Sequence, residues 1–403
     1  MASTNPSLDI PSPSATTAET TLLVSLAPSS PEHFDIILSN IALALSSHSL
    51  VIASPEGSPA TSLSFPAASI RLVQYAPVSV STAGWVLTAA DFLNLYHLLE
   101  QHNASVCLLI GADCHTLSHE TIQALAESVL FDHNDLVVPR YNLGAYDGLV
   151  TSAILYPVTR ALYGTRPRFP LAIDMGLSRR MAQRLASAAQ KFTAASQNDA
   201  LIWPVAEAAV AGFSVAEIDG GSRVLPTPTS PDLNSLLSHV ASSLFSDVDS
   251  KAAFWQRSRT THPTQMLPPT HPGAPPPDIA PMIEGFRLAY TNLQEIWSLV
   301  LPPAALLGLK RLSQVPPTSF RMADSLWARI VYDFLLAFRL RTINRGHLLG
   351  ALTPLYLAWV ASHILLTADG TAAEAHIQTQ ATAFEQEKPY LVSRWRWPDR
   401  FNP

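Results

Sequence analysis

Residues 106–138 read VCLLIGADCHTLSHETIQALAESVLFDHNDLVV, and this stretch decides the fold. An apolar run at 106–110 ends just before Asp113, Ser118 opens an amphipathic helix, and a second apolar strand follows at 136–138. A strand, a helix and a strand in succession are typical of a parallel sheet. Because ligands collect where the strands of such a sheet end, Asp113 is a candidate ligand-binding residue.

The same alternation extends outward on both sides. Apolar runs predict strands at 21–26, 49–53 and 70–75, and helical patterns lie between and after them at 31–46, 88–101, 176–194 and 205–211. Segments 214–218 and 222–225 are candidates for further strands. The expected fold is therefore α/β, with a mostly parallel, doubly wound, Rossmann-like sheet.

Composition narrows the classes of protein to consider. The 403 residues are 48% hydrophobic, enough for a large core, and carry a formal net charge of −6. Without a Lys/Arg cluster the chain has no track for phosphates, so nucleic acid is not an expected partner. Two cysteines make a disulfide framework or a zinc site improbable and fit a reducing cytoplasm, the expected location.

Four segments organise the chain. Residues 1–20 are rich in Ser, Thr and Pro, lack a secretory signal and predict a disordered lead-in. The sheet domain is expected over 21–261, and the proline-rich residues 262–281 form a linker or surface loop. An α-helical region is expected over 282–403.

Apolar spacing in the helical region makes three further predictions. Trp327, Val331, Phe334 and Phe338 share one face of a helix, which should be buried against the sheet domain or against a second subunit in a homodimer. Residues 348–368 are long enough to cross a bilayer, but Pro354 favours a core helix and no membrane span is expected. A capping box from Thr371 predicts a helix ending at 386, after which 388–397 form a packed tail or, alternatively, a lid.

Two motifs carry a resemblance to a known family. They are YDGLVTSAILYPVTRALYG at 146–164 and FPLAIDMGLS at 169–178, and they resemble the family-2-like GT-A glycosyltransferases of the glucosyl-3-phosphoglycerate synthase and mannosylglycerate synthase type. The resemblance implies a GT-A-like domain that transfers a hexose from a nucleotide sugar to a small hydroxyl acceptor, such as a glycerate-type compound.

The resemblance also implies roles for single residues. Gly148, Thr151 and Arg160 would bind the acceptor, Thr151 and Asp174 would act as catalytic residues, and Asp113 would lie near the donor diphosphate. A hydroxyl, a guanidinium and a carboxylate are suited to form hydrogen bonds with the hydroxyls and carboxylate of such an acceptor. The alternative is structural: Thr151 and Asp174 cap helices, and Arg160 pairs with an acid.

Several expected donor-side residues are absent. The resemblance implies Mg²⁺ or Mn²⁺ on the donor diphosphate, held by carboxylates and a histidine. In this sequence the first acid of the Asp-x-Asp motif corresponds to Gly111, a second acid to Leu201 and the histidine to Leu225, while Ala53 and Ser54 stand where a nucleotide-contacting acid is expected. The alternative function is therefore a catalytically inactive homologue that acts as a binding or scaffold protein.

The sequence leaves two alternatives to the missing metal ligands. Asp113 and His115, with His119 nearby, have the spacing of a metal site suited to Mn²⁺ or Zn²⁺. Alternatively the protein is metal-independent and an arginine stands in for the cation. The candidates are Arg71, Arg140, Arg166, Arg168 and Arg223.

Overall fold

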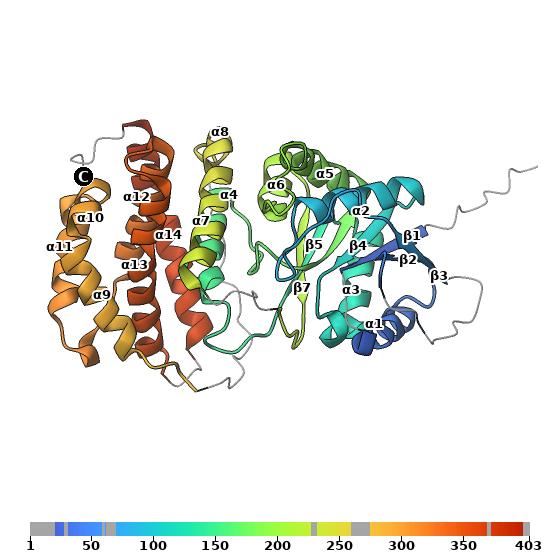
Figure 1. Ribbon diagram of the computed structural model, residues 1–403, viewed down its shortest axis with the longest axis horizontal. Coiled ribbons are helices and arrows are strands. Elements are labelled where there is room, and N and C mark those ends of the chain that lie inside the picture. Colours follow the sequence, from blue (N-terminus) through green and yellow to red (C-terminus); the bar gives the residue numbers. More distant parts are fainter. Residues whose placement is uncertain are drawn as a thin grey trace, which may run out of the picture.

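The computed structural model describes residues 21–27, 31–58, 61, 70–226, 232–258, 275–368 and 372–397. Figure 1 shows a sheet domain at one end of the molecule and a helical region at the other. The predicted lead-in at 1–20, most of the proline-rich segment and the capping residue Thr371 lie outside the described residues.

Seven strands form one mixed sheet in the order β3-β2-β1-β4-β6-β5-β7. The strands are β1 (Thr21–Leu26), β2 (Ser49–Pro55), β3 (Ile70–Tyr75), β4 (Val106–Ile110), β5 (Leu136–Arg140), β6 (Asp174–Ser178) and β7 (Val215–Asp219). All described pairings are parallel except those that β6 makes with β4 and β5. The predicted α/β fold with a mostly parallel sheet is confirmed.

Strand β6 corrects one sequence prediction. Residues from Gly176 onward were expected to be helical, but Gly176 lies in β6 and helix α5 begins only at Arg179 (Arg179–Thr193). The side chain of Ser178 accepts a hydrogen bond from the Met181 amide and so marks the start of that helix. The candidate strand at 222–225 is also wrong, because these residues form an irregular segment after β7.

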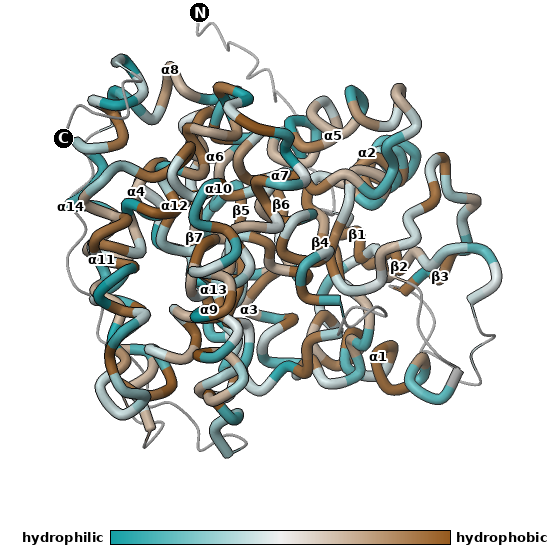
Figure 2. The backbone as a smooth tube through the Cα atoms, turned by 60° about the vertical axis from the view of Figure 1, so that its left-hand side comes forward, coloured by the Kyte–Doolittle hydropathy of each residue, from teal (hydrophilic) through white to brown (hydrophobic). Residues whose placement is uncertain are grey.

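Helices cover both faces of the sheet. Helices α1 (Pro31–Ala44) and α3 (His119–Leu130) pack on one face, and α2 (Ala89–Gln101) and α5 on the other. The short helix α6 (Pro204–Ala211) follows α5. In Figure 2 the strands are predominantly hydrophobic, whereas α2 carries hydrophilic stretches, as expected for an outer helix.

The helical region draws on segments from both halves of the chain. Helix α4 (Tyr156–Tyr163), which follows a π-helical turn η2 (Thr151–Leu155), and helix α7 (Leu233–Ser250) pack in one core with the C-terminal helices. The remaining helices are α8 (Ala252–Trp255), α9 (Ala280–Asn292), α10 (Gln294–Val300), α11 (Pro303–Gln314), α12 (Asp324–Leu340), α13 (Arg345–Leu366) and α14 (Ala373–Arg396). Figure 1 shows α4 and α7 beside α12, α13 and α14.

Helix α12 buries the face that its sequence pattern predicted. Trp327, Val331 and Phe334 have no exposed surface, and Phe338 is 2% exposed. The ring of Phe338 meets Phe245 of α7 edge-on, with the ring centroids 5.7 Å apart. This face was expected to pack against the sheet domain or a second subunit. Its partners include helices of the same chain, such as α7.

Helix α13 is the apolar segment considered as a membrane span. It is the one helix in the described part of the chain long and apolar enough to cross a bilayer, and 72% of its most apolar stretch is buried inside the protein. Near its end His363, which is fully buried, stacks on Trp359 and lies 2.7 Å from His376 of α14 between the two Nδ1 atoms. Such burial is what the core-helix interpretation predicts.

Helix α14 is longer than predicted. It runs through Pro389 to Arg396 instead of ending at residue 386. Trp395, near its end, is 5% exposed and meets Trp255 edge-on at a centroid distance of 5.0 Å. The tail is therefore packed on the helices as far as Trp395, as favoured over a lid, whereas Trp397 is 71% exposed.

Candidate functional site

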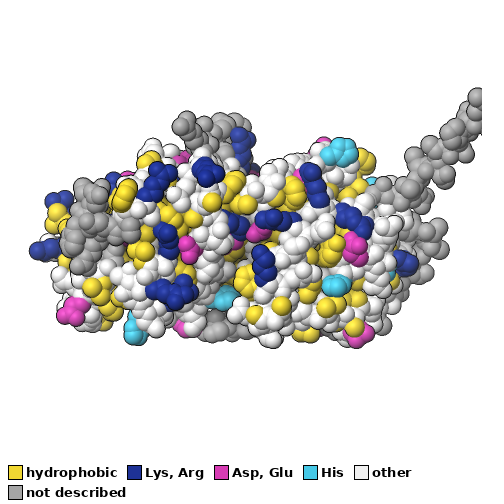
Figure 3. All heavy atoms as spheres, turned by 90° about the horizontal axis from the view of Figure 1, so that it is seen from above, with side chains coloured by type: hydrophobic (Ala, Val, Ile, Leu, Met, Phe, Trp, Pro, Cys, Tyr) yellow, Lys and Arg dark blue, Asp and Glu magenta, His cyan; other side chains and the backbone are white. Residues whose placement is uncertain are grey.

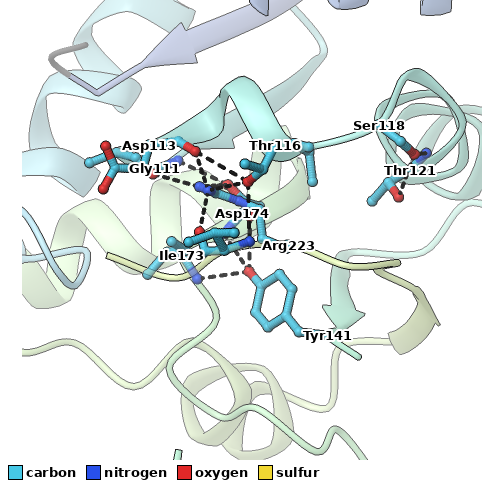
Figure 4. A network of polar contacts seen from close by, with 12 residues as sticks. Gly111, Asp113, Thr116, Ser118, Thr121, Tyr141, Ile173, Asp174 and Arg223 are labelled. Carbon is cyan, nitrogen blue, oxygen red and sulfur yellow. Dashed lines mark hydrogen bonds and ion pairs between the residues drawn. The ribbon is translucent and has the colours of Figure 1, made fainter. Parts of the chain in front are cut away.

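Asp174, a predicted catalytic residue, lies in a fully buried ion pair. It is the first residue of β6 and sits opposite Ile110 at the end of β4. Its Oδ2 lies 3.0 Å from Arg223 Nε and accepts a hydrogen bond from the Tyr141 hydroxyl at 3.0 Å, and its Oδ1 accepts from the Gly111 amide (Figure 4). Neither charged side chain has exposed surface. Every strong interaction of this carboxylate is therefore with the protein itself.

Tyr141 completes this buried cluster from the end of β5. Its hydroxyl donates to Asp174, and its oxygen accepts from the amides of Ile173 and Asp174 at 3.2 and 3.1 Å. Burial and the adjacent carboxylate raise the pKa of Tyr141 well above its ordinary value, so the phenol keeps its proton. The cluster joins the ends of β4, β5 and β6.

Arg223 also holds the loop that follows β4. Its guanidinium donates to the carbonyl oxygens of Ala112 and Asp113 and to the hydroxyl of Thr116. Asp113 adopts a left-handed conformation with φ of 52°, and its carboxylate points away from the guanidinium in Figure 4. This exposed carboxylate is free to meet a ligand, whereas Arg223 is already saturated.

Gly111 stands where the resemblance places an acid, and the space for a side chain has closed. A Cβ atom built on Gly111 would lie 2.8 Å from the carbonyl oxygen of Ile173 and 2.9 Å from the Ile173 Cβ. Real Cβ atoms do not approach a backbone oxygen this closely. A carboxylate-bearing side chain at this position would therefore require the backbone near Ile173 to shift.

The residues present do not fit a divalent cation. His115 is stacked on His33 at a centroid distance of 3.5 Å, and its Nδ1 is buried without a hydrogen-bond partner among the described residues. Burial and His33 lower the pKa of His115. His119 pairs with Glu120. No three His, Cys, Asp or Glu side chains of the described residues converge as metal ligands.

A cavity lies at the carboxyl ends of β1, β2, β3 and β4. Its volume is about 310 Å³, and Ser25, Tyr75, Asp91, Asn94 and Gly111 are among its lining residues. Burial raises the pKa of Asp91, whose carboxylate accepts from the amide and hydroxyl of Thr88 and so caps α2. Among the described lining residues there is no lysine or arginine. This is where a ligand of an open α/β sheet is expected.

The loop over this cavity is held by two side chains. Asn94 accepts from the amides of Val78 and Ser79, and Asp199 accepts from the amide and hydroxyl of Thr82. Asp199 thus has a role as a loop anchor, close to Leu201, where the resemblance placed an acid. Leu201 itself is 3% exposed and forms a backbone bridge with Thr88.

A second cavity of about 750 Å³ lies between the sheet domain and the helices. It contains Gly148 and Thr151, two predicted acceptor residues, and also Leu225, the position at which a histidine was expected. Gly148 has a φ of +61°, which glycine adopts readily. The two cavities share Val86 and Ile173 as lining residues, so they adjoin at the end of β4.

Arg160, the third predicted acceptor residue, is directed elsewhere. It is 7% exposed and pairs with Glu385 of α14 at 2.9 Å, with a further hydrogen bond to Gln378. These contacts tie α4 to α14. The structure therefore brings Gly148 and Thr151 together in one cavity, with Asp174 buried behind its wall and Arg160 outside it.

The other four candidate arginines are not among the described lining residues of either cavity. Arg71 contacts His102 at the surface, Arg166 is exposed, and Arg168 pairs with Glu374. Arg140 and Arg168 both line a small cavity of about 90 Å³ beside the second cavity. In Figure 3 the basic side chains are spread over the visible face of the molecule rather than gathered into one track.

Sequence reasoning missed Tyr141 and Tyr356. Tyr356 of α13 lines the second cavity, although it lies more than 200 residues from Thr151 in the sequence. No local pattern marks such a residue, because the same spacing would place any apolar side chain in the helix core. A tyrosine inside an otherwise apolar helix was the available signal.

No protein-family model matches the chain, and no curated protein matches it. Solved structures similar to it include glucosyl-3-phosphoglycerate synthase from Mycobacterium tuberculosis in complex with Mn²⁺, UDP-glucose and phosphoglyceric acid, at 15% identity and a TM-score of 0.39, covering 62% of this chain and 89% of that one. The same enzyme with Mn²⁺, UDP-glucose and glycerol 3-phosphate matches at 15% identity and 0.38, over 57% and 80%. With UDP alone it matches at 15% and 0.37, over 58% and 80%.

Proposed function

We propose that the chain is a glycosyltransferase-like protein with a site for two ligands. A nucleotide sugar would occupy the cavity at the ends of β1 to β4, and a small hydroxyl compound would occupy the adjoining cavity with Gly148 and Thr151. The observation that carries the proposal is that the two cavities meet at Val86 and Ile173. A transferred group must pass between two ligands held side by side.

Binding of the nucleotide would not depend on a divalent cation. Asp113 is the exposed acid on the loop after β4, and the Arg223 guanidinium already holds the carbonyl groups of that loop. A single carboxylate beside a buried positive charge is a poor site for Mg²⁺ or Mn²⁺, which need several oxygen ligands. The described lining of the first cavity offers the diphosphate no lysine or arginine, so weak, metal-insensitive binding is the expected result.

Calorimetric titration with UDP-glucose tests this proposal, in Mn²⁺ and in chelator. We expect equal affinity in both. The variant Ala83→Trp, which fills the first cavity, should weaken binding at least about tenfold. Ala195→Trp, a matched change at an exposed position outside that cavity, should leave it unchanged. Binding that chelator abolishes would contradict the metal-free site, and absence of binding in both conditions would contradict the proposal.

A second candidate function is an inactive homologue that binds its ligand without turnover. It is favoured by the state of Asp174, which is fully buried and paired with Arg223 and so cannot reach a substrate in this arrangement. An NMR assay that monitors the release of UDP from UDP-glucose, with glycerol or glycerate as the acceptor, distinguishes an active transferase from an inactive homologue. Binding without release would favour the inactive homologue.

A further inference from the structure

The second cavity is largely apolar, whereas the similar solved structures hold the anions phosphoglyceric acid or glycerol 3-phosphate. Leu143, Phe169, Leu171, Leu236 and Val240 are among its lining residues, contributed by the sheet domain and by α7. Its volume of about 750 Å³ would hold a compound of drug-like size. We infer, on the basis of the proposed function, that the hydroxyl compound bound here is an uncharged alcohol with an apolar body.

Charge disfavours an anionic ligand in this cavity. Of its described lining residues, Asp147 and Arg223 carry charge. Arg223 has no exposed surface and is paired with Asp174, so it offers nothing to a bound anion. Asp147 is an exposed carboxylate and repels one. A phosphate or carboxylate confined to this cavity would therefore lose its hydration without gaining a cation from the described lining, since Arg140 and Arg168 line the smaller cavity beside it.

Two hydroxyl groups of the cavity, those of Tyr356 and Thr151, are placed to form hydrogen bonds with a bound alcohol. Tyr356 is 4% exposed, and its hydroxyl has no hydrogen-bond partner among the described residues. Burial raises the pKa of Tyr356, so the phenol stays protonated and remains a donor. The hydroxyl of Thr151, in the η2 turn, is likewise without a partner in the described part of the chain. The Tyr356 oxygen keeps some accessible surface, so the hydroxyl can donate to a ligand in the cavity.

The test compares two probes of the same shape. 4-Phenylbutan-1-ol and 4-phenylbutyrate share an apolar body and differ in the alcohol and the carboxylate. Calorimetry and ligand-observed NMR on the full chain should show binding of the alcohol, with the carboxylate at least about tenfold weaker. 3-Phosphoglycerate should not bind. Equal or tighter binding of either anion, or no binding of the alcohol, would overturn the inference.

Variants locate the binding. Leu236→Trp fills the cavity and should abolish binding of 4-phenylbutan-1-ol, whereas Leu307→Trp, at an exposed position on α11, should not. Tyr356→Phe should weaken binding several-fold, and the matched change Tyr290→Phe on α9, outside the cavity, should leave it unchanged. Should Leu236→Trp fail to fold, Leu225→Trp serves the same purpose. Undiminished binding to a folded cavity-filling variant would overturn the assignment.

The experiments distinguish a failure of the proposed transferase-like function from a failure of the inferred ligand class. UDP-glucose is titrated into the same protein preparation. If UDP-glucose binds and the alcohol does not, the ligand class is wrong while the proposed function stands. If the alcohol binds in a Leu236-dependent manner and UDP-glucose does not bind, the apolar ligand class stands and the transferase-like function is wrong.

Discussion

At the scale of single residues, the buried pair of Asp174 and Arg223 dominates the site. The substitution Asp174→Asn leaves the Arg223 guanidinium buried without its counter-charge, and we expect a loss of roughly 3–5 kcal/mol in the free energy of unfolding. Urea denaturation measures it. The double variant Asp174→Asn, Arg223→Met should recover part of the loss, because no uncompensated charge remains. A single variant as stable as the parent would contradict this structural role.

Gly111 makes a second prediction at this scale. Restoring the acid with Gly111→Asp places a Cβ 2.8 Å from the Ile173 carbonyl oxygen, so the loop or β6 must shift. We expect a loss of about 1–3 kcal/mol and no gain in Mn²⁺ affinity. Thermal melting and Mn²⁺ calorimetry test both, with Ala112→Asp as the control on the neighbouring residue. A stable variant with tighter Mn²⁺ binding would show that the frame of a metal site survives.

At the scale of elements, the packing of α13 against α14 should respond to pH. Burial lowers the pKa of His363 to about 3, below its value of about 6.5 in an unfolded chain. The unfolded chain therefore takes up a proton at a pH at which the folded protein does not. The stability that neutral His363 contributes is complete above about pH 6.5 and is lost as the pH falls toward 3, by up to about 1.4 kcal/mol per unit.

The variant His363→Phe isolates this effect, since phenylalanine keeps the stacking on Trp359 but does not titrate. Urea denaturation between pH 7 and pH 4 should show a shallower decline for this variant than for the parent. His239→Phe, at an exposed position on α7, should follow the parent. If the free energy of unfolding declined equally with falling pH in all three proteins, His363 would not be the cause of the pH dependence.

Helix α12 depends on its buried face. Phe338→Ala should cost roughly 3–5 kcal/mol in unfolding free energy, because the Phe245 ring loses its partner and a cavity remains. Leu340→Ala, two residues along and 44% exposed, should cost well under 1 kcal/mol. Denaturant unfolding of the two variants gives the comparison. Equal effects would mean that α12 is not held by this face.

Much of the element pattern could be predicted, and the failures have physical causes. Strands 21–26, 70–75 and 106–110 match because an apolar run between polar turns has few other solutions. Strand β6 was missed because Met175-Gly176-Leu177 directly precedes a good helix start, and the serine cap at Ser178 gives no local sign of a strand before it. The role of Arg223 was open among five arginines, since its partners other than the Val224 carbonyl lie 49 or more residues away.

At the scale of the whole molecule, the core of the helical region is built from both halves of the chain. Phe245 and Trp255, which precede the proline-rich segment, pack against Phe338 and Trp395, which follow it. A fragment of residues 1–261 would expose these rings and those around α4. We expect it to aggregate or to melt well below the full chain, as measured by light scattering and circular dichroism. A monomeric fragment with the parent's melting temperature would show that the sheet domain is independent.

The position of β6 has a consequence for how the chain assembles. The strands before it can form the group β3-β2-β1-β4, but β5 has no neighbour until β6 has been inserted between β4 and β5. A nascent chain that ends before residue 174 therefore holds a four-stranded group with open edges and the unpaired strand β5. Because this joining step needs contacts between distant segments, it should be late and slow, and chaperone binding during synthesis should persist until β6 has emerged.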